Sequence, residues 1–105
     1  MKLTKKNILI ALRAAKSAEE VLHIFELRSK DKRPREAIEA ARAWTRGEIT
    51  VGQARKAALA AHAAARSVMD VAQYAARAAG HAAATAHVAT HAKGVKFYVD
   101  KIKAS

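Results

Sequence analysis

Cysteine is absent from this 105-residue sequence, and there are only one proline, four glycines and five aromatic residues. Without cysteine there is no disulfide framework, no thiol nucleophile and no cysteine-bound metal. No apolar run reaches the length of a membrane span, and Arg13 interrupts the short apolar stretch near the start, which is too short for a signal peptide. These absences lead us to expect a soluble, cytoplasmic protein with no membrane contact.

Acidic residues are also few. Nine aspartates and glutamates stand against twenty lysines and arginines, which gives a formal net charge of +11 and an isoelectric point near 10.5. Such a surface favours partners that carry acidic groups or are polyanions. Alanine, the strongest helix former, is abundant, and no stretch alternates like a strand. The sequence predicts one all-α domain over residues 1–105, a compact bundle of five or six mostly antiparallel, alanine-rich helices.

Local signals predict where these helices begin and end. Ser17 and Glu20 form a possible capping box, so the first apolar segment is either one long helix or two. Thr50 with Gln53 forms a second capping box, and Gly47 ends the helix before it. The expected helices cover residues 5–16, 17–25, 34–46, 51–66, about 67–88 and 90–102. Residues 28–35 are a basic inter-helix loop in this scheme, with Asp31 as a cap, and residues 100–105 are a lysine-rich C-terminal tail.

The helical spacing also predicts which residues are buried. Trp44 shares one face of its helix with Ala37 and Ala41, so we expect it to lie in the core. The opposite face is polar and carries Arg35, Glu39, Arg42 and Arg46. In the first helix the apolar residues at helical spacing are Ile8, Leu9, Leu12 and Ala15. Gly80 lies inside a strongly helical run, so we expect it to permit close helix approach rather than a turn.

Three histidines fall within GHAAATAHVATHAKG at residues 80–94. If one helix reaches at least Val88, His81 shares a polar stripe with Asp70, Tyr74, Arg77 and Thr85, and His87 points elsewhere. On a continuous helix His81 and His91 lie about 15 Å apart, so the three cannot share one metal ion. We expect His81 to be neutral and hydrogen-bonded between helices, with Glu39, Thr85 or a backbone carbonyl as its partner. A metal ion shared by His87 and His91 stays open, and His62 is expected on a partly solvated face.

Catalytic and nucleic-acid motifs are missing. There is no glycine-rich phosphate loop, no serine in a nucleophile elbow and no plausible pair of catalytic carboxylates, so we predict that the protein is not an enzyme. Lys30, Lys32, Arg33 and Arg35 form a dense basic patch, either a phosphate- or carboxylate-binding segment or a solvated turn paired with neighbouring acids. Five aromatic residues are too few to predict a base-stacking platform.

Three blocks, in order, resemble the putative immunity protein family of bacterial polymorphic toxin systems. They are DKRPREAIEAARAWTRGEI at residues 31–49, ARKAALAAHAAAR at 54–66 and GHAAATAHVATHAKG at 80–94. The resemblance covers about residues 8–99. It implies an all-α domain that neutralises a cognate toxin by binding it, and it assigns no role to any single residue.

We therefore expect a non-enzymatic, immunity-like protein without a cofactor or metal, which occludes a toxin through basic side chains that meet acidic groups. The candidate partner-binding residues are Arg33, Arg35, His62, Arg77, His81, His87 and His91. The candidate structural residues are Pro34, Glu39, Trp44, Gly47 and Gly80. The alternatives are a basic nucleic-acid-associated helical protein, which the net charge favours, and a helical bundle that binds a metal or small ligand through its histidines.

Overall fold

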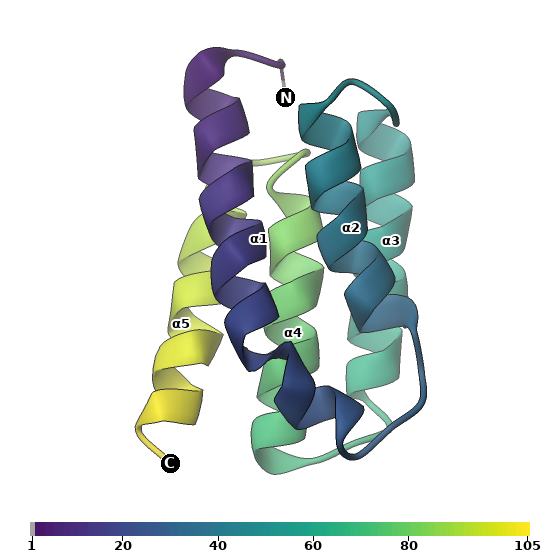
Figure 1. The fold of residues 1–105 in the computed structure, drawn as a ribbon, viewed down its shortest axis with the longest axis vertical. Coiled ribbons are helices and arrows are strands. Elements are labelled where there is room, and N and C mark those ends of the chain that lie inside the picture. Colours follow the sequence, from purple (N-terminus) through teal and green to yellow (C-terminus); the bar gives the residue numbers. More distant parts are fainter. Residues whose placement is uncertain (1) are drawn as a thin grey trace.

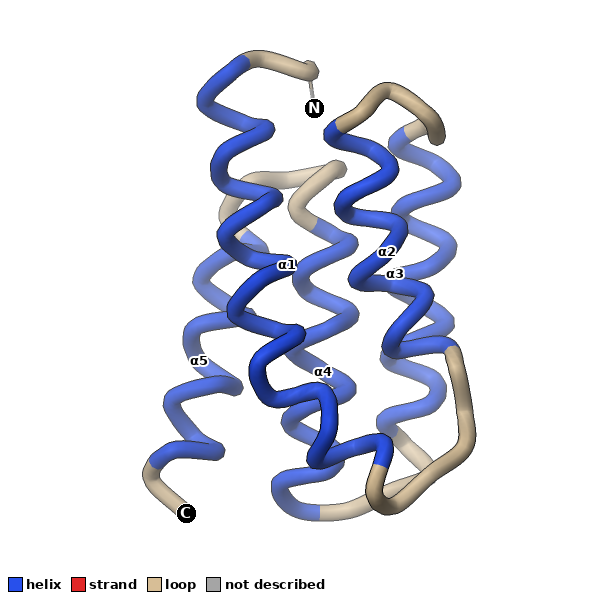
Figure 2. The backbone as a smooth tube through the Cα atoms, viewed as in Figure 1, coloured by secondary structure: helices blue, strands red, loops and turns tan. Residues whose placement is uncertain are grey.

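Five α-helices joined by short turns make up the structure, a computed structural model that describes residues 2–105. The helices are α1 (Lys5–Glu26), α2 (Arg33–Thr45), α3 (Val51–Ala65), α4 (Asp70–Ala84) and α5 (His91–Lys103). Successive helices run in opposite directions (Figure 1), and only helices and loops occur over these residues (Figure 2). The predicted all-α antiparallel bundle is confirmed. Within residues 2–105, no helix combines the length and the apolar character needed to cross a bilayer.

The first two expected segments form a single helix, α1. It begins after Thr4, whose hydroxyl accepts the backbone N–H of Asn7 at 3.2 Å, and it passes through Ser17 without a break. Its buried face consists mainly of alanine, with Val21, Leu22 and Phe25 added toward its end. Of the apolar residues whose spacing predicted this helix, Leu9 and Leu12 lie outside the buried face, with side chains that are 46% and 40% exposed.

The turn between α2 and α3 follows the local signals closely. Gly47 adopts a left-handed φ of 71°, its N–H donates to the carbonyl of Trp44, and the N–H of Glu48 donates to that of Ala43. This pair of bonds is a Schellman motif, in which glycine avoids the Cβ penalty of a positive φ. The capping box of Thr50 and Gln53 is present in both directions. The helix boundaries predicted here are therefore confirmed.

Three other helix boundaries differ from the prediction. The N-cap of α2 is Lys32 rather than Asp31, although the Asp31 carboxylate accepts the backbone N–H of Arg33. The helix expected from about residue 67 begins at Asp70, and the Ser67 hydroxyl donates backward to the carbonyl of Ala64. The helix expected to reach Val88 ends at Ala84, where the backbone tightens into turns.

The helices form two layers with α4 at the centre. α1 and α2 lie side by side in front of α5, α4 and α3, and α4 contacts each of the other four helices (Figure 1). Nine residues of α4 are buried, all of them alanine or glycine. Small side chains suit this position because they let helices approach closely on several sides. Trp44 is 2% exposed and packs with Ala11, Ala54 and Ala86, so its predicted burial is confirmed.

Candidate functional site

Histidines from three helices meet on the outer surface of α4, where α3 and α5 flank it. The rings of His62 from α3 and His81 from α4 are edge to face, with centroids 5.0 Å apart. The rings of His81 and His91, the first residue of α5, have centroids 5.1 Å apart, and their Nδ1 atoms are 2.9 Å apart. We call these three residues the histidine cluster.

The prediction that His81 and His91 lie far apart is wrong. α4 ends at Ala84, the chain reverses, and α5 then runs antiparallel beside α4, which brings the start of α5 back to His81. The predicted interhelical hydrogen bond of His81 is confirmed, but its partner is His91. Of the expected partners, Glu39 is exposed, and Thr85 is fully buried with its hydroxyl donating to the carbonyl of Ala82.

Two glycines make room for the imidazole rings. A Cβ built on Gly80 would lie 2.7 Å from both Cε1 and Nε2 of His62, and one built on Gly94 would lie 2.6 Å from Cγ and Nδ1 of His81. Both glycines lie inside helices, where glycine costs about 1 kcal/mol relative to alanine. The close approach expected at Gly80 is confirmed, and what approaches is a histidine ring.

The histidine cluster continues into a group of aromatic rings that the sequence did not predict. Tyr98 stacks against His81 with centroids 5.7 Å apart, and Tyr74 lies 5.9 Å from Tyr98. Phe97 packs edge to face on Tyr98, and the Lys101 ammonium lies over the rings of both Tyr74 and Phe97. The few aromatic residues of the sequence therefore gather on one surface, although the spacing along each helix does not show it.

Burial and neighbouring positive charges keep the histidine cluster neutral near pH 7. Burial lowers the pKa of His62 to about 4, with the charges of His81, Arg77, His91 and Arg66 lowering it further. Burial also lowers the pKa of His81, aided by His91 and Arg77, and the pKa of His91, aided by His87. The direction for His81 agrees with the predicted neutral state.

The predicted place of His62 is a partly solvated face. Its side chain is half-buried, and its Nδ1 atom is buried without a hydrogen-bond partner. The ring packs over Gly80 and against His81, so it belongs to the seam between α3 and α4. The expected partial exposure of His62 agrees with its half-buried side chain, but the contact with Gly80 was not predicted, because the helix wheel of α3 alone does not show that α4 presents a glycine at that level.

A pocket of about 220 Å³ opens beside the histidine cluster. We call it the histidine pocket; its lining residues are Arg55, Ala58, Leu59, His62, Ala84, His87 and His91. Three imidazoles and a guanidinium thus surround one concavity with an alanine floor, an arrangement suited to an anionic group. Over residues 2–105, no group of three histidine, aspartate or glutamate side chains is placed to hold a metal ion.

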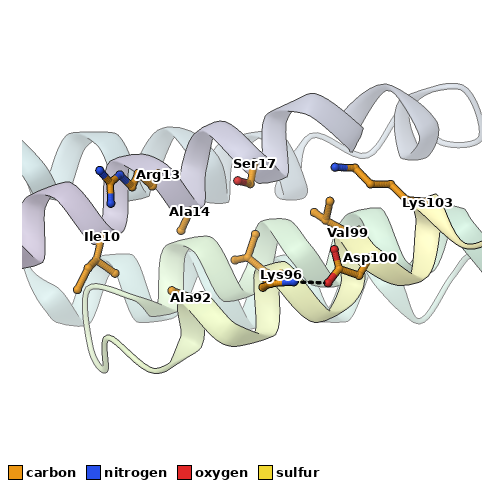
Figure 3. Close-up of a pocket in the computed structure, with 10 residues that line it drawn as sticks. Ile10, Arg13, Ala14, Ser17, Ala92, Lys96, Val99, Asp100 and Lys103 are labelled. Carbon is orange, nitrogen blue, oxygen red and sulfur yellow. Dashed lines mark hydrogen bonds and ion pairs between the residues drawn. The ribbon is translucent and has the colours of Figure 1, made fainter.

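A second concavity lies between α1 and α5, with a volume of about 370 Å³. Arg13 and Lys103 lie toward its opposite ends, while Lys96 donates to the Asp100 carboxylate at 2.6 Å (Figure 3). Its floor includes Ala14 and the buried Val95 and Val99. Its polar groups are separated or paired with each other, so they do not converge on a ligand. The histidine pocket is therefore the stronger candidate site.

Comparison with known protein families matches residues 2–104 to the Imm-5 like putative immunity protein family. The chain belongs to this family. No curated protein and no solved structure matches the chain. The predicted resemblance is thus confirmed over nearly the whole length, including the segments that carry the histidine cluster.

The basic candidate residues of this Imm-5 like chain fall into two groups. Arg33 pairs with Asp31, and Arg35 pairs through two hydrogen bonds of 2.6 and 2.7 Å with Glu26, so carboxylates of the same chain already hold both. Arg77 is half-buried on α4, one turn before His81, and raises the positive potential at the cluster. Of these three arginines, only Arg77 adds to the histidine site.

The structural candidates of the Imm-5 like chain are placed mostly as expected. Pro34 is buried in the first turn of α2, Trp44 is in the core and Gly47 forms the turn after α2. Gly80 is buried beneath the His62 ring. Glu39 is exposed on α2, where its charge helps to raise the pKa of Arg35.

Proposed function

We propose that this protein neutralises a cognate bacterial toxin by binding it, without catalysing a reaction. The observation that carries the proposal is the match to the Imm-5 like putative immunity protein family over residues 2–104. A rigid helical bundle suits this role because a preformed surface loses little conformational entropy on binding.

The surface of α3, α4 and α5 around the histidine cluster is the proposed contact region. Stable protein interfaces are enriched in aromatic residues and arginine, and this surface carries Tyr74, Tyr98 and Arg77 in one patch. Two large apolar side chains beside it are solvent-exposed, Leu59 to 62% and Phe97 to 55%. A partner that covers this patch would bury both.

Charge favours an acidic partner. The chain carries a net charge of +11, and within residues 2–105 five acidic residues are held in intramolecular ion pairs: Glu19, Glu26, Asp31, Glu48 and Asp100. The remaining basic side chains are therefore largely uncompensated. Complementary charge on the toxin would speed association and set orientation more than it would raise affinity.

The direct test is co-expression with the toxin encoded by a neighbouring gene. Cells that express the toxin should grow only when the wild-type chain is present. Arg55→Glu at the edge of the histidine pocket should weaken protection, whereas Lys16→Glu, which makes the same charge change at an exposed position on α1, should preserve it. Failure of the wild-type chain to protect against that toxin would refute the proposed function.

A nucleic-acid-associated role is the second candidate, and the net charge of +11 is the observation that favours it. Binding of this kind should weaken steeply with added salt, because it depends on release of counterions from phosphates. A gel-shift titration with duplex DNA and RNA at low salt would test it. No shift at low salt would exclude this role.

A further inference from the structure

We propose that the histidine pocket receives one aspartate or glutamate side chain of the toxin, and that the histidine cluster takes up about one proton as that carboxylate enters. This inference rests on the proposed function and names the chemistry of its contact. Three observations on the described residues carry it: the convergence of cationic and imidazole groups, the absence of a compensating acid, and the bond between His81 and His91.

The first observation is geometric. Arg55 and His62 from α3, His87 from the turn after α4 and His91 from α5 all line a single concavity of about 220 Å³. A water molecule occupies about 30 Å³ in the liquid, so a carboxylate with its methylene groups fits with water to spare. A guanidinium beside imidazoles is a good set of donors for carboxylate oxygens. Exposed Leu59 at the same pocket offers an apolar contact to the rest of the toxin segment.

The second observation is electrostatic. No acidic residue lines the pocket, and no acidic group is among the charges that shift the pKa values of the cluster. The charges that lower these pKa values come from every side of the cluster: Arg66 at the C-cap of α3, Arg77 and His81 from α4, His91 from α5, and His87 from the preceding turn. An entering carboxylate would supply the missing negative charge and would raise the pKa of the nearest imidazoles.

The third observation limits how many protons the His81–His91 pair can accept. The Nδ1 atoms of His81 and His91 are 2.9 Å apart, so one ring donates and the other accepts. A single added proton goes to Nε2 of the donating ring and leaves this hydrogen bond intact. A second proton would place hydrogens on both facing nitrogens and break it. The pair therefore accommodates one proton, shared next to the pocket that His91 lines.

His62 can adjust to the occupant. Its Nδ1 atom has no hydrogen-bond partner, so no bond at that nitrogen fixes the ring. A 180° flip about the Cβ–Cγ bond keeps the plane of the ring over Gly80 and would change which nitrogen the ring offers to a carboxylate in the pocket. Orientation of His62 and protonation of the His81–His91 pair are then two separate responses to one ligand.

The expected consequence is pH-dependent affinity for the toxin. Proton uptake on binding strengthens the complex as pH falls, by up to about tenfold in Kd per pH unit for one proton. This range lies between the lowered pKa of the free pair and its raised pKa in the complex, and it therefore includes pH 7 when the carboxylate lifts the pKa above neutrality. Lower pH should tighten the complex for as long as the bundle itself stays folded.

Isothermal titration calorimetry with the toxin from the neighbouring gene tests the inference. Titrations at pH 7 in Bis-Tris and in Tris, which differ in ionisation enthalpy and are not anions, give the number of protons taken up. The wild-type chain should take up about one proton, and His91→Gln should reduce this to near zero and weaken binding. His23→Gln, at an exposed histidine on α1 outside the cluster, should leave the proton number unchanged. Circular dichroism at 222 nm should verify that each variant is folded.

A second experiment uses sodium acetate as the probe. Histidine proton resonances of the free chain, followed over pH by NMR, should give a higher pKa for His91 in acetate than in chloride at equal ionic strength.

An effect of acetate without proton uptake on toxin binding would assign the pocket to free carboxylates and overturn the toxin assignment. Toxin binding with a proton number unaffected by His91→Gln would overturn the inference alone, whereas no binding by the wild-type chain would refute the proposed function. Identical pKa values in acetate and chloride would count against a carboxylate site.

Discussion

Replacing Gly80 with alanine tests whether a histidine ring determines the packing between α3 and α4. The new Cβ would lie 2.7 Å from two atoms of the His62 ring, so the ring must retreat by about 0.7 Å to reach an ordinary contact of 3.4 Å. Alanine gains about 1 kcal/mol of helix propensity. Overpacking of this kind costs about 1–3 kcal/mol. We expect a net loss of about 1 kcal/mol of unfolding free energy, equivalent to a fall in Tm of roughly 4–8 °C.

The sign should reverse when His62 is removed. In a His62→Ala background, Gly80→Ala meets no ring and should stabilise the protein by about 1 kcal/mol. Urea denaturation followed at 222 nm for the wild type, both single variants and the double variant gives a coupling energy, expected at about 1–3 kcal/mol. Gly52→Ala is the matched control, because a Cβ on this helical glycine meets only the Thr50 hydroxyl at 3.8 Å. A clear gain in stability for Gly80→Ala in the wild type would refute the reasoning.

Other substitutions and conditions have defined outcomes. Trp44→Ala should lower the unfolding free energy by about 3–5 kcal/mol in urea titrations, because Trp44 is 2% exposed. Thr50→Ala removes the side-chain cap that accepts the Gln53 N–H, and should cost about 1 kcal/mol in the same assay. The pKa of His62 is lowered to about 4 in the folded state, so its contribution is complete above pH 6.5 and should be lost as pH falls from there toward 4. His62→Gln and His81→Gln should each reduce this loss of unfolding free energy at low pH. Chelators should leave Tm unchanged, whereas a fall in Tm that zinc restores would indicate a metal site.

Part of the candidate site could be predicted from the sequence, and part could not. The histidines at residues 81 and 91 stand out among alanines, and the interhelical hydrogen bond of His81 was predicted from the cost of burying an unpaired polar group. The partner in that hydrogen bond, His91, could not be predicted. That pairing depends on the end of α4 at Ala84, and the segment after it carries alanine, threonine and histidine with no proline or glycine until Gly94. A helix end without a strong local signal is set by packing.

Two further features could not be predicted from the sequence. They are the concavity between α1 and α5 and the group of aromatic rings formed by Tyr74, Tyr98 and Phe97. Both require that α5 lie beside α1 and α4, and sequence spacing gives only the face of one helix at a time. The exposed positions of Leu9 and Leu12 have a related cause. In the first half of α1 the buried residues are alanines, Ala11, Ala14 and Ala15, whose small side chains permit close approach of neighbouring helices, and Leu9 and Leu12 lie outside this face.

The sequence by itself determined the features that depend on local interactions. Alanine content made the chain helical, the Thr50–Gln53 box and Gly47 set two helix ends, and helical spacing placed Trp44 inside. Only the tertiary structure decided that His62, His81 and His91 form one cluster, since these residues come from three helices. Contacts between residues far apart in the chain depend on where helices end and how closely they pack, and in this bundle both depend on small side chains that leave little periodic signal.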